Sequence, residues 1–329
     1  MISGKSSSNL SINPGSALAR PHLSVGDRHQ DEGAQLVSAH SAPMSTDQSG
    51  NWLALPQRQF GIGSRFLIVG DVHGQFDMLQ RVLAAAEYDE HLDVLIGVGD
   101  LIDRGPQSVE VVRFFSSSAR RFCTMGNHEA YLLEAGGVPT DAHAWCANGG
   151  DWAMWAEPQD IAYCYKALSE FPISIELFVD QPALRIGIIH AEVPEGLSWA
   201  DIYRLRVDRD DFRSMASLPV DEWLRGRHRI KSAALAQAFL DEPNGAFPFG
   251  TDVVNTPGID LVISGHSILN LRRPFRSGNH LWIDTGAFEH KYGGRLTVVD
   301  PTAEVYWQAS SKESFGPLSL RDESIWRLK

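Results

Sequence analysis

Short apolar runs alternate with amphipathic segments along the chain from Arg65 onward. Three runs have the length of buried strands, and two segments with a helical period lie between them: RFLIVG, DVLIGVG and RFCTMG for the strands, FDMLQRVLAAAEY and SVEVVRFFSS for the helices. This order of strand and helix is typical of a parallel sheet that is covered on both faces. The pattern therefore predicts an α/β region that begins near residue 65.

The second half of the chain carries a different pattern. Its apolar runs RIGIIH, DLVISGH, HLWIDTG and RLTVVD are more closely spaced, as in a second group of strands. Residues 130 to 170, which are rich in Trp and Ala, are expected to be mostly helical. The fold class expected from the pattern is thus α/β with two sheet regions.

The first 60 residues differ from the rest of the chain. They are rich in Ser, Gly, Pro and Asn and show no sustained period of a strand or helix. We therefore expect a disordered N-terminal tail over residues 1–60, a catalytic domain over 61–310 and a C-terminal tail over 311–329.

Composition limits the class of protein. The chain has 329 residues, of which 43% are hydrophobic, so it can bury the core of one large α/β domain. A net charge of −12 argues against a nucleic-acid-binding protein, because such proteins present a basic face to phosphates. The three cysteines lack the spacing of a zinc site or a disulfide framework, which indicates a reducing compartment. Without an apolar run of about 20 residues or a signal peptide, we expect a soluble, cytoplasmic protein with no membrane partner.

Polar residues typical of metal and phosphate sites follow five of the expected strands. In open α/β sheets the loops that leave the carboxyl ends of the strands converge and bind ligands. Taken singly, each of these residues is an ordinary cap or turn residue, and it is their common position that indicates a site. The residues are Asp71 and His73, Asp100, Asp103 and Arg104, Asn127 and His128, His190, and His266.

Six of these residues suit a pair of divalent metal ions. Asp71 and His73 are two positions apart and would share one ion, because alternate side chains of an extended segment point to the same side. Asp100 would bridge to a second ion about 3.5 to 4 Å away. The second ion would also take Asn127, His190 and His266, a mixed N and O set that favours Mn²⁺, with Fe or Zn as alternatives.

The same residues predict the chemistry. Two divalent ions bring about four positive charges and the two aspartates remove two, so an acidic protein would still attract a phosphate dianion there. A water on the metals would lose its proton near neutral pH and attack phosphorus in line with the leaving group. His128 would protonate the leaving oxygen while Asp103 holds its ring. Arg104 would bind two phosphate oxygens through its planar guanidinium.

The motifs resemble those of a known family. GDVHG, GDLIDRG and GNHE occur in this order with gaps of 24 and 20 residues, and HAE and GHS follow. The set is similar to the signature of the phosphoprotein phosphatase family of calcineurin-like metallophosphoesterases, over about residues 65 to 300. The segments NGGDW and WIDTGA resemble its bacterial and phage branch.

The resemblance implies a fold and further roles. The family's fold is a pair of β-sheets sandwiched between helical layers (α/β/β/α), with a dinuclear metal site at the strand ends. The resemblance makes His128 the proton donor, Asp103 the residue that orients it, and Arg104 a phosphate ligand. A later arginine should also grip phosphate, and EWLRGRHRI offers Arg225, with Arg227 as the alternative if the alignment shifts.

Three functions are compatible with these residues and motifs. The first is a phosphomonoesterase acting on phosphoserine or phosphothreonine in proteins, with phosphotyrosine as a further option. The second is a symmetrical bis(5'-nucleosyl)-tetraphosphatase, which shares much of the motif set but tends to have Ala-Arg where this chain has Asp103-Arg104. The third is an inactive phosphatase-like binding module, which should have lost a ligand position, whereas this chain retains them all. The expected partner is a phosphorylated protein or another phosphoester.

Overall fold

A computed structural model describes residues 51–61, 63–139, 144–204, 220–231, 254–270 and 272–321. Most of the expected N-terminal tail, residues 1–50, lies outside these ranges, as do the last eight residues of the chain. All the elements below belong to one compact unit of the chain.

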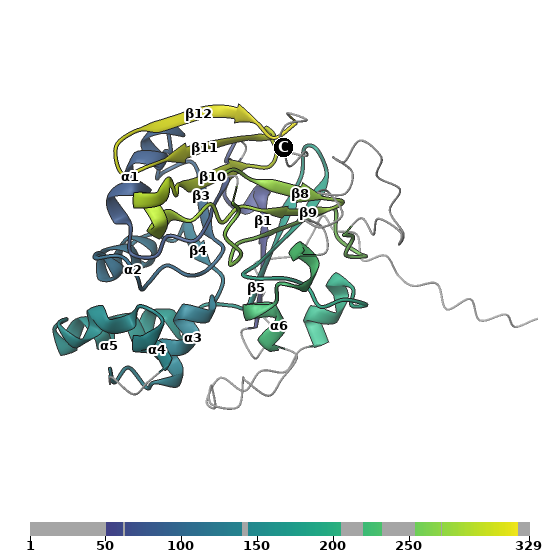
Figure 1. Ribbon diagram of the computed structural model, residues 1–329. Helices are drawn as coiled ribbons and strands as arrows, with labels where there is room; N and C mark the ends of the chain where they lie inside the picture. The colour runs from purple at the N-terminus through teal and green to yellow at the C-terminus, as the bar shows by residue number, and fades with distance from the viewer. Residues whose placement is uncertain are drawn as a thin grey trace, which may run out of the picture. The chain divides into compact units, whose positions relative to one another are not determined.

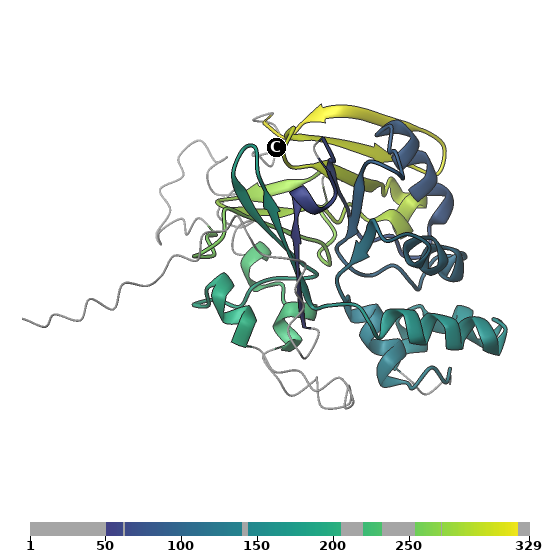
Figure 2. The same cartoon turned by 180° about the vertical axis from the view of Figure 1, so that it is seen from behind.

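Two six-stranded mixed sheets form the centre of this unit (Figures 1 and 2). The first contains, in spatial order, β1 (Trp52–Pro56), β5 (Ser174–Val179), β6 (Leu184–Ile189), β7 (Leu261–Ser264), β9 (His280–Trp282) and β8 (Phe275–Ser277). The second contains β12 (Ser314–Ser319), β11 (Val305–Ala309), β10 (Leu296–Asp300), β2 (Phe66–Val69), β3 (Val94–Gly97) and β4 (Arg121–Cys123).

The helices and 3-10 turns of the described residues lie between the strands in the chain. The helices are α1 (Phe76–Ala85), α2 (Ser108–Ser116), α3 (Asn127–Glu134), α4 (Ala144–Ala147), α5 (Pro158–Leu168) and α6 (Val220–Arg225). The 3-10 turns are η1 (Gln57–Gln59), η2 (Gly150–Met154), η3 (Trp199–Arg204) and η5 (Ala287–Tyr292).

The apolar runs of the sequence form the strands that the pattern predicted. Strands β2, β3 and β4 are parallel neighbours joined through α1 and α2, and β7 is parallel to β6. Parallel strands joined by helices end at the same edge of a sheet. The fold therefore brings the residues after these strands to one edge.

The two sheets pack face to face through alternate residues of their strands. Phe66 and Ile68 of β2 share a buried cluster with Ile186 and Ile188 of β6, while Leu67 belongs to the second cluster, which includes the helices. A strand buried on both faces must be apolar throughout, which is why β2 and β3 read as continuous apolar runs.

Helices and 3-10 turns cover the outer faces of the sheets, which confirms the α/β/β/α arrangement. Helices α1 and α2 pack on the sheet that contains β10, β11 and β4. On the other sheet, Trp199 of η3 lies against Gly187 of β6, and the backbone oxygen of Trp223 in α6 accepts a hydrogen bond from Ala191.

Two strands lie outside the expected limits of the catalytic domain, residues 61–310. Strand β1 belongs to the stretch that we expected to be a tail, yet it pairs in parallel with β5 and buries Leu53 and Leu55. Strand β12 pairs with β11. Strand β1, WLALP, is apolar but follows directly on the Ser- and Gly-rich stretch, and it was counted with that stretch. Strand β12, SFGPLS, has no apolar pattern of its own, and pairing with β11 defines it. No helix among the described residues is long and apolar enough to cross a membrane.

The position of β1 leads to a test of its contribution to the core. Leu55 is fully buried and pairs with Leu177 of β5. We expect Leu55→Ala to reduce the free energy of unfolding by about 2 to 5 kcal/mol, because the substitution leaves a cavity between the sheets. The matched control is Leu92→Ala, since Leu92 is 61% exposed and its substitution should change stability by less than about 0.5 kcal/mol. Equal effects in chemical denaturation would show that β1 does not contribute to the core.

Candidate metal centre and active site

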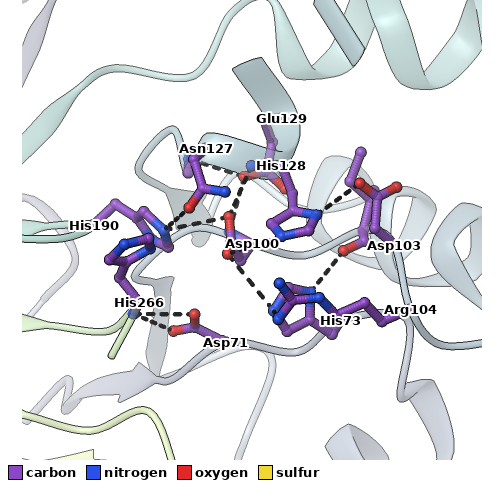
Figure 3. Close-up of polar contacts among 12 residues, drawn as sticks. Asp71, His73, Asp100, Asp103, Arg104, Asn127, His128, Glu129, His190 and His266 are labelled. Atoms are coloured by element: carbon purple, nitrogen blue, oxygen red, sulfur yellow. Dashed lines mark hydrogen bonds and ion pairs between the residues drawn. The ribbon is translucent and has the colours of Figure 1, made fainter. Parts of the chain in front are cut away.

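The polar residues after five strands lie together in one cluster (Figure 3). They come from the loops after β2, β3, β6 and β7 and from the first turn of α3, which follows β4. These elements supply Asp71 and His73, Asp100, His190, His266, and Asn127 with His128. The buried strands thus fix the backbone from which each side chain reaches the cluster.

The backbone of this cluster is strained. Within the described residues, eight residues other than glycine have a positive φ. Five of the eight are predicted site residues: His73, Asp100, Asp103, Arg104 and His266. A side chain in this left-handed region costs free energy and persists where the surrounding structure demands it, which is most often at a functional site.

Asp100 lies at the centre of the cluster, with its two carboxylate oxygens facing different histidines. Oδ1 is 3.3 Å from Nε2 of His190, and Oδ2 is 3.6 Å from Nε2 of His73. Oδ2 is also 3.9 Å from Nε2 of His128. Asp100 is therefore common to two groups of side chains that could each hold a metal ion: His73, Asp100 and His128, and Asp100, His190 and His266.

The ring orientation of His73 leaves a lone pair inside the cluster. Its Nδ1 lies 3.0 Å from the backbone oxygen of Ile102, which can only accept a hydrogen bond, so Nδ1 carries the proton. Nε2 then has the free lone pair, and Nη1 of Arg104 lies 3.1 Å from it as a donor. A backbone carbonyl that fixes the tautomer in this way is typical of metal-binding histidines.

His190 faces a position that suits a cation. Its Nδ1 lies 2.9 Å from the backbone oxygen of Val98, which again fixes the proton on that nitrogen. Its Nε2 then points at two further acceptors, Oδ1 of Asn127 at 3.0 Å and Oδ1 of Asp100 at 3.3 Å. Three acceptor atoms can converge only around an additional proton or a metal ion, and this donor set suits a transition metal.

His266 lies beside His190, with the two ring centres 5.0 Å apart, and its backbone contacts Asp71. Within the described residues, Nε2 of His266 is buried without a hydrogen-bond partner, as expected of a nitrogen whose partner is a metal. The backbone N–H of His266 donates to the carboxylate of Asp71 at 3.0 and 3.1 Å. A Cβ on Gly265 would come within 1.9 Å of Oδ1 of Asp71, so this close approach requires glycine.

Burial and neighbouring charges alter the ionisation of these groups. Burial raises the pKa of Asp71 well above its ordinary value, and the charge of Asp284 raises it further. For Asp100, burial is outweighed by neighbouring histidines, above all His190, and its pKa is well below the usual range. Burial lowers the pKa of His190, but Asp100 more than reverses this and raises it to about 9. The carboxylates thus bring negative charge into the cluster that neutral histidines do not balance, and this favours protonation of Asp71 and His190.

His128 is held by a carboxylate and does not point its Nδ1 at the cluster. Nδ1 lies 2.8 Å from Oδ2 of Asp103, and Asp103 also accepts hydrogen bonds from the indole N–H groups of Trp152 at 2.7 Å and Trp145 at 3.1 Å. An indole can only donate, so Asp103 is oriented as an acceptor toward His128. Burial raises the pKa of Asp103, and the hydrogen bonds from His128 and the two tryptophans oppose this rise.

Glu129 binds the backbone of the segments that follow β3 and β4. Its carboxylate accepts hydrogen bonds of 2.8 Å from the N–H groups of Asp100, Leu101 and Gly126. A Cβ on Gly126 would come within 2.2 Å of Oδ1 of Asp100, which explains the glycine before Asn127. Burial raises the pKa of Glu129 to about 7, and the charge of Asp100 contributes to the rise.

The arginines predicted to bind phosphate lie at the border of the cluster. The guanidinium of Arg104 is 4.2 Å from the centre of the Phe288 ring. Arg225 ends α6, stacks on Tyr131 at 4.9 Å and lies 3.4 Å from the carboxylate of Glu134. Arg227 donates a hydrogen bond of 3.4 Å to the backbone oxygen of His266. Both alternatives for the second arginine are therefore close to the site.

Sequence reasoning missed five residues that complete the site. Glu129 is part of the GNHE motif, Trp152 of NGGDW and Asp284 of WIDTGA, so their motifs pointed to them although their roles were not recognised. Nothing in the sequence indicated Trp145 or Phe288, because their contacts with Asp103 and Arg104 depend on how α4 and η5 fold over the site.

Comparisons with known proteins agree on the family. Residues 64–269 match the model of the calcineurin-like phosphoesterases. The chain is 37% identical over 224 residues to serine/threonine-protein phosphatase 2 of Escherichia coli, an alignment that covers 67% of this chain and 86% of that protein.

Two further comparisons involve dinucleotide hydrolases. Over 69 residues the chain is 45% identical to the symmetrical bis(5'-nucleosyl)-tetraphosphatase of Coxiella burnetii. This alignment covers 21% of this chain and 24% of that protein. A solved structure of a candidate diadenosine tetraphosphatase is similar with a TM-score of 0.50 and 22% identity, over 79% of this chain and 97% of that one. At this identity the structural likeness concerns the fold alone.

The geometry of the cluster leads to a prediction about metal content. We expect about two transition-metal ions per chain by elemental analysis, because two groups of ligands share Asp100. Chelation should abolish phosphoester hydrolysis, and Mn²⁺ should restore it. Full activity of metal-free protein would contradict the prediction.

Two matched substitutions test the central position of Asp100. Asp100→Asn should reduce metal content more than Asp71→Asn, because only Asp100 faces both groups of ligands. Both substitutions replace one buried carboxylate by an amide of the same shape. Equal metal content in the two variants would remove the bridging role from Asp100.

Proposed function

Because the chain belongs to the calcineurin-like phosphoesterase family, we propose that it is a metal-dependent protein serine/threonine phosphatase. Membership of the family makes it a metallophosphoesterase, a hydrolase whose substrates are phosphoesters. The observation that carries the narrower proposal is the His128–Asp103 pair, which is buried and held by two tryptophans.

The proposed metal ligands fall into two sets around Asp100. In the structure His73 and Asp100 group with His128, and Asp71 is in neither group. Because Asp103 holds the Nδ1 of His128, we assign His128 to proton transfer. Asp71 would then complete the first set with His73 and Asp100, and Asn127, His190 and His266 would complete the second. The converging acceptors at His190 and the unpartnered Nε2 of His266 support this assignment. When bound, the ions would activate water for attack on phosphorus and neutralise charge on the phosphate.

His128 is the proposed general acid. Its Nδ1 proton is committed to Asp103, so the Nε2 of the imidazolium is the atom that can give a proton to the leaving oxygen. The carboxylate of Asp103 stabilises the protonated ring and keeps its orientation. Trp145 and Trp152 hold Asp103 in turn, so the ring of His128 has little freedom to rotate away.

Arg104, which lies beside His73, is the proposed phosphate ligand. Stacking on Phe288 fixes the plane of its guanidinium, so two N–H groups can meet two phosphate oxygens. Arg225 or Arg227 would supply a second positive charge near His266 and His128.

The strength of the general-acid arrangement favours a phosphomonoester of a protein over a dinucleotide. A serine or threonine alkoxide is a poor leaving group and needs a proton during bond cleavage, whereas the phosphate group of a nucleotide leaves with less assistance. Burying the carboxylate of Asp103 costs free energy even with three hydrogen-bond donors. The proton transfer that it supports accelerates the reaction most when the leaving group is poor. The relative from Escherichia coli, matched over most of its length, is named as a phosphatase of the same class.

The second candidate is the symmetrical bis(5'-nucleosyl)-tetraphosphatase. The 45% identity over 69 residues to such an enzyme from Coxiella burnetii supports it, although the match covers about a quarter of that protein. Family membership and the metal cluster are compatible with both reactions, so only a comparison of activity on the two classes of substrate distinguishes them.

The proposed role of His128 predicts a dependence on the leaving group. His128→Asn should retain both metals, yet lose roughly 10²- to 10⁴-fold in kcat on a phosphoserine peptide and much less on an activated aryl phosphate. The control is His91→Asn, which removes a histidine from the surface and should leave both rates unchanged. Equal losses on both substrates would assign His128 to binding or to metal support.

Direct comparison of substrates tests the proposed specificity. With Mn²⁺ present, we expect the wild-type protein to have a higher kcat/KM on phosphoserine and phosphothreonine peptides than on diadenosine tetraphosphate. The opposite ranking, with two ADP as the product, would favour the second candidate and show that Asp103 does not distinguish the two classes.

A further inference from the structure

The segment that carries Arg225 and Arg227, residues 220–231, is joined to the rest of the described structure by buried side chains and hydrogen bonds. Its residues include α6 and a helical turn at 228–231. Trp223 and Leu224 bury their side chains, and the backbone oxygen of Trp223 accepts a hydrogen bond of 2.9 Å from Ala191. The backbone position of both arginines therefore depends on how this segment is attached to its neighbours.

The carboxylate of Glu192 accepts hydrogen bonds from three consecutive backbone N–H groups of this segment. Its side chain is buried, with 3% of the residue exposed, on the loop that follows β6 and two residues after His190. Oε1 accepts a hydrogen bond of 2.5 Å from the backbone N–H of His228, and Oε2 accepts one of 2.9 Å from that of Arg229. The N–H of Ile230 contributes a third. One carboxylate thus satisfies the first backbone donors of the helical turn.

The side chain of Arg229 reinforces the same junction from the other side. Its guanidinium donates to the backbone oxygen of Pro194 at 2.9 Å and to that of Asn255 at 3.3 Å. Glu192 and Arg229 therefore link the loop after β6 to the turn by contacts in both directions. Neither residue belongs to the metal cluster or to the proposed phosphate ligands.

Glu192 connects the strand that holds a proposed metal ligand to the turn that follows the two arginines. On one side of Glu192 is the rigid strand β6, which also holds His190. On the other side is the turn that begins directly after Arg225 and Arg227. A shift of this turn would move the arginines relative to the metal cluster while leaving the cluster itself in place.

We propose that Glu192 is a positioning residue that sets the distance between the metal cluster and the phosphate-binding arginine of residues 225–227. The inference rests on the proposed function, and it predicts an effect on the binding of phosphate more than on the chemical step. It also assigns a role to the glutamate of the HAE motif, which has no place among the metal ligands.

The first test is the substitution Glu192→Gln. The amide keeps the shape of the side chain but turns an N–H₂ group toward one of the backbone donors, so the turn should move. With p-nitrophenyl phosphate and Mn²⁺ we expect KM to rise roughly three- to tenfold and kcat to change less than about twofold. The inhibition constant of inorganic phosphate should rise by a similar factor, with metal content unchanged.

The matched control is Glu195→Gln on the same loop. Glu195 is exposed, and its ion-pair partner among the described residues is the exposed side chain of His228. Its substitution removes the same charge from the same region, so KM and the phosphate inhibition constant should stay at the wild-type values. Glu192→Asp keeps the charge at a shorter reach and should give an intermediate KM.

A double-mutant cycle asks whether Glu192 acts through an arginine. Glu192→Gln is combined with Arg225→Ala and, separately, with Arg227→Ala. If Glu192 positions one of them, its effect on KM should disappear in the background that lacks that arginine and persist in the other. The same cycle thereby identifies the phosphate ligand of the pair.

Several outcomes would overturn the inference. They are a wild-type KM in Glu192→Gln, additive effects in both arginine backgrounds, or loss of metal or kcat without a change in KM. If Glu192→Gln does not fold, a wild-type KM in Glu192→Asp has the same meaning. Failure of the proposed function is a separate result, because the wild-type protein with Mn²⁺ would then not hydrolyse any phosphomonoester.

Discussion

Buried negative charge at the edge of the two sheets is the constraint on which the site depends. Asp71, Asp100, Glu129 and Asp284 are all buried, and a carboxylate away from water is costly unless charges or hydrogen bonds compensate it. Glu129 is compensated by three backbone N–H groups. Burial raises the pKa of Asp284 to about 6, so this group is only partly compensated. We infer that two divalent ions supply the remaining positive charge.

The same constraint explains why the backbone is strained where it is. Loops that leave a buried sheet must turn sharply to place Asp100 among His73, His128 and His190, and the positive φ of Asp100 is one result. The glycines that approach the carboxylates most closely, at positions 126 and 265, leave no room for a Cβ. The cost of these conformations is offset by the buried strands on which the loops stand.

Much of the fold and of the cluster could be predicted from the sequence. The apolar runs define β2, β3, β6 and β7, and the residues directly after a strand of a parallel sheet must meet at one edge. The contacts of Trp145 with Asp103 and of Glu192 with the arginine segment could not be predicted, because they join residues 42 and 36 positions apart through irregular segments. Strand β12 was missed for a related reason, since pairing with β11 defines it more than its own pattern does, whereas the apolar β1 was counted with the polar stretch that precedes it.

Anomalous X-ray scattering from crystals grown with Mn²⁺ tests the central claim most directly. We expect two anomalous peaks roughly 3.5 to 4 Å apart, one next to each oxygen of Asp100. The peak next to Oδ1 should also contact Asn127, His190 and His266. A single peak, or peaks that Asp100 does not touch, would contradict the claim and show that the buried carboxylates are compensated in another way.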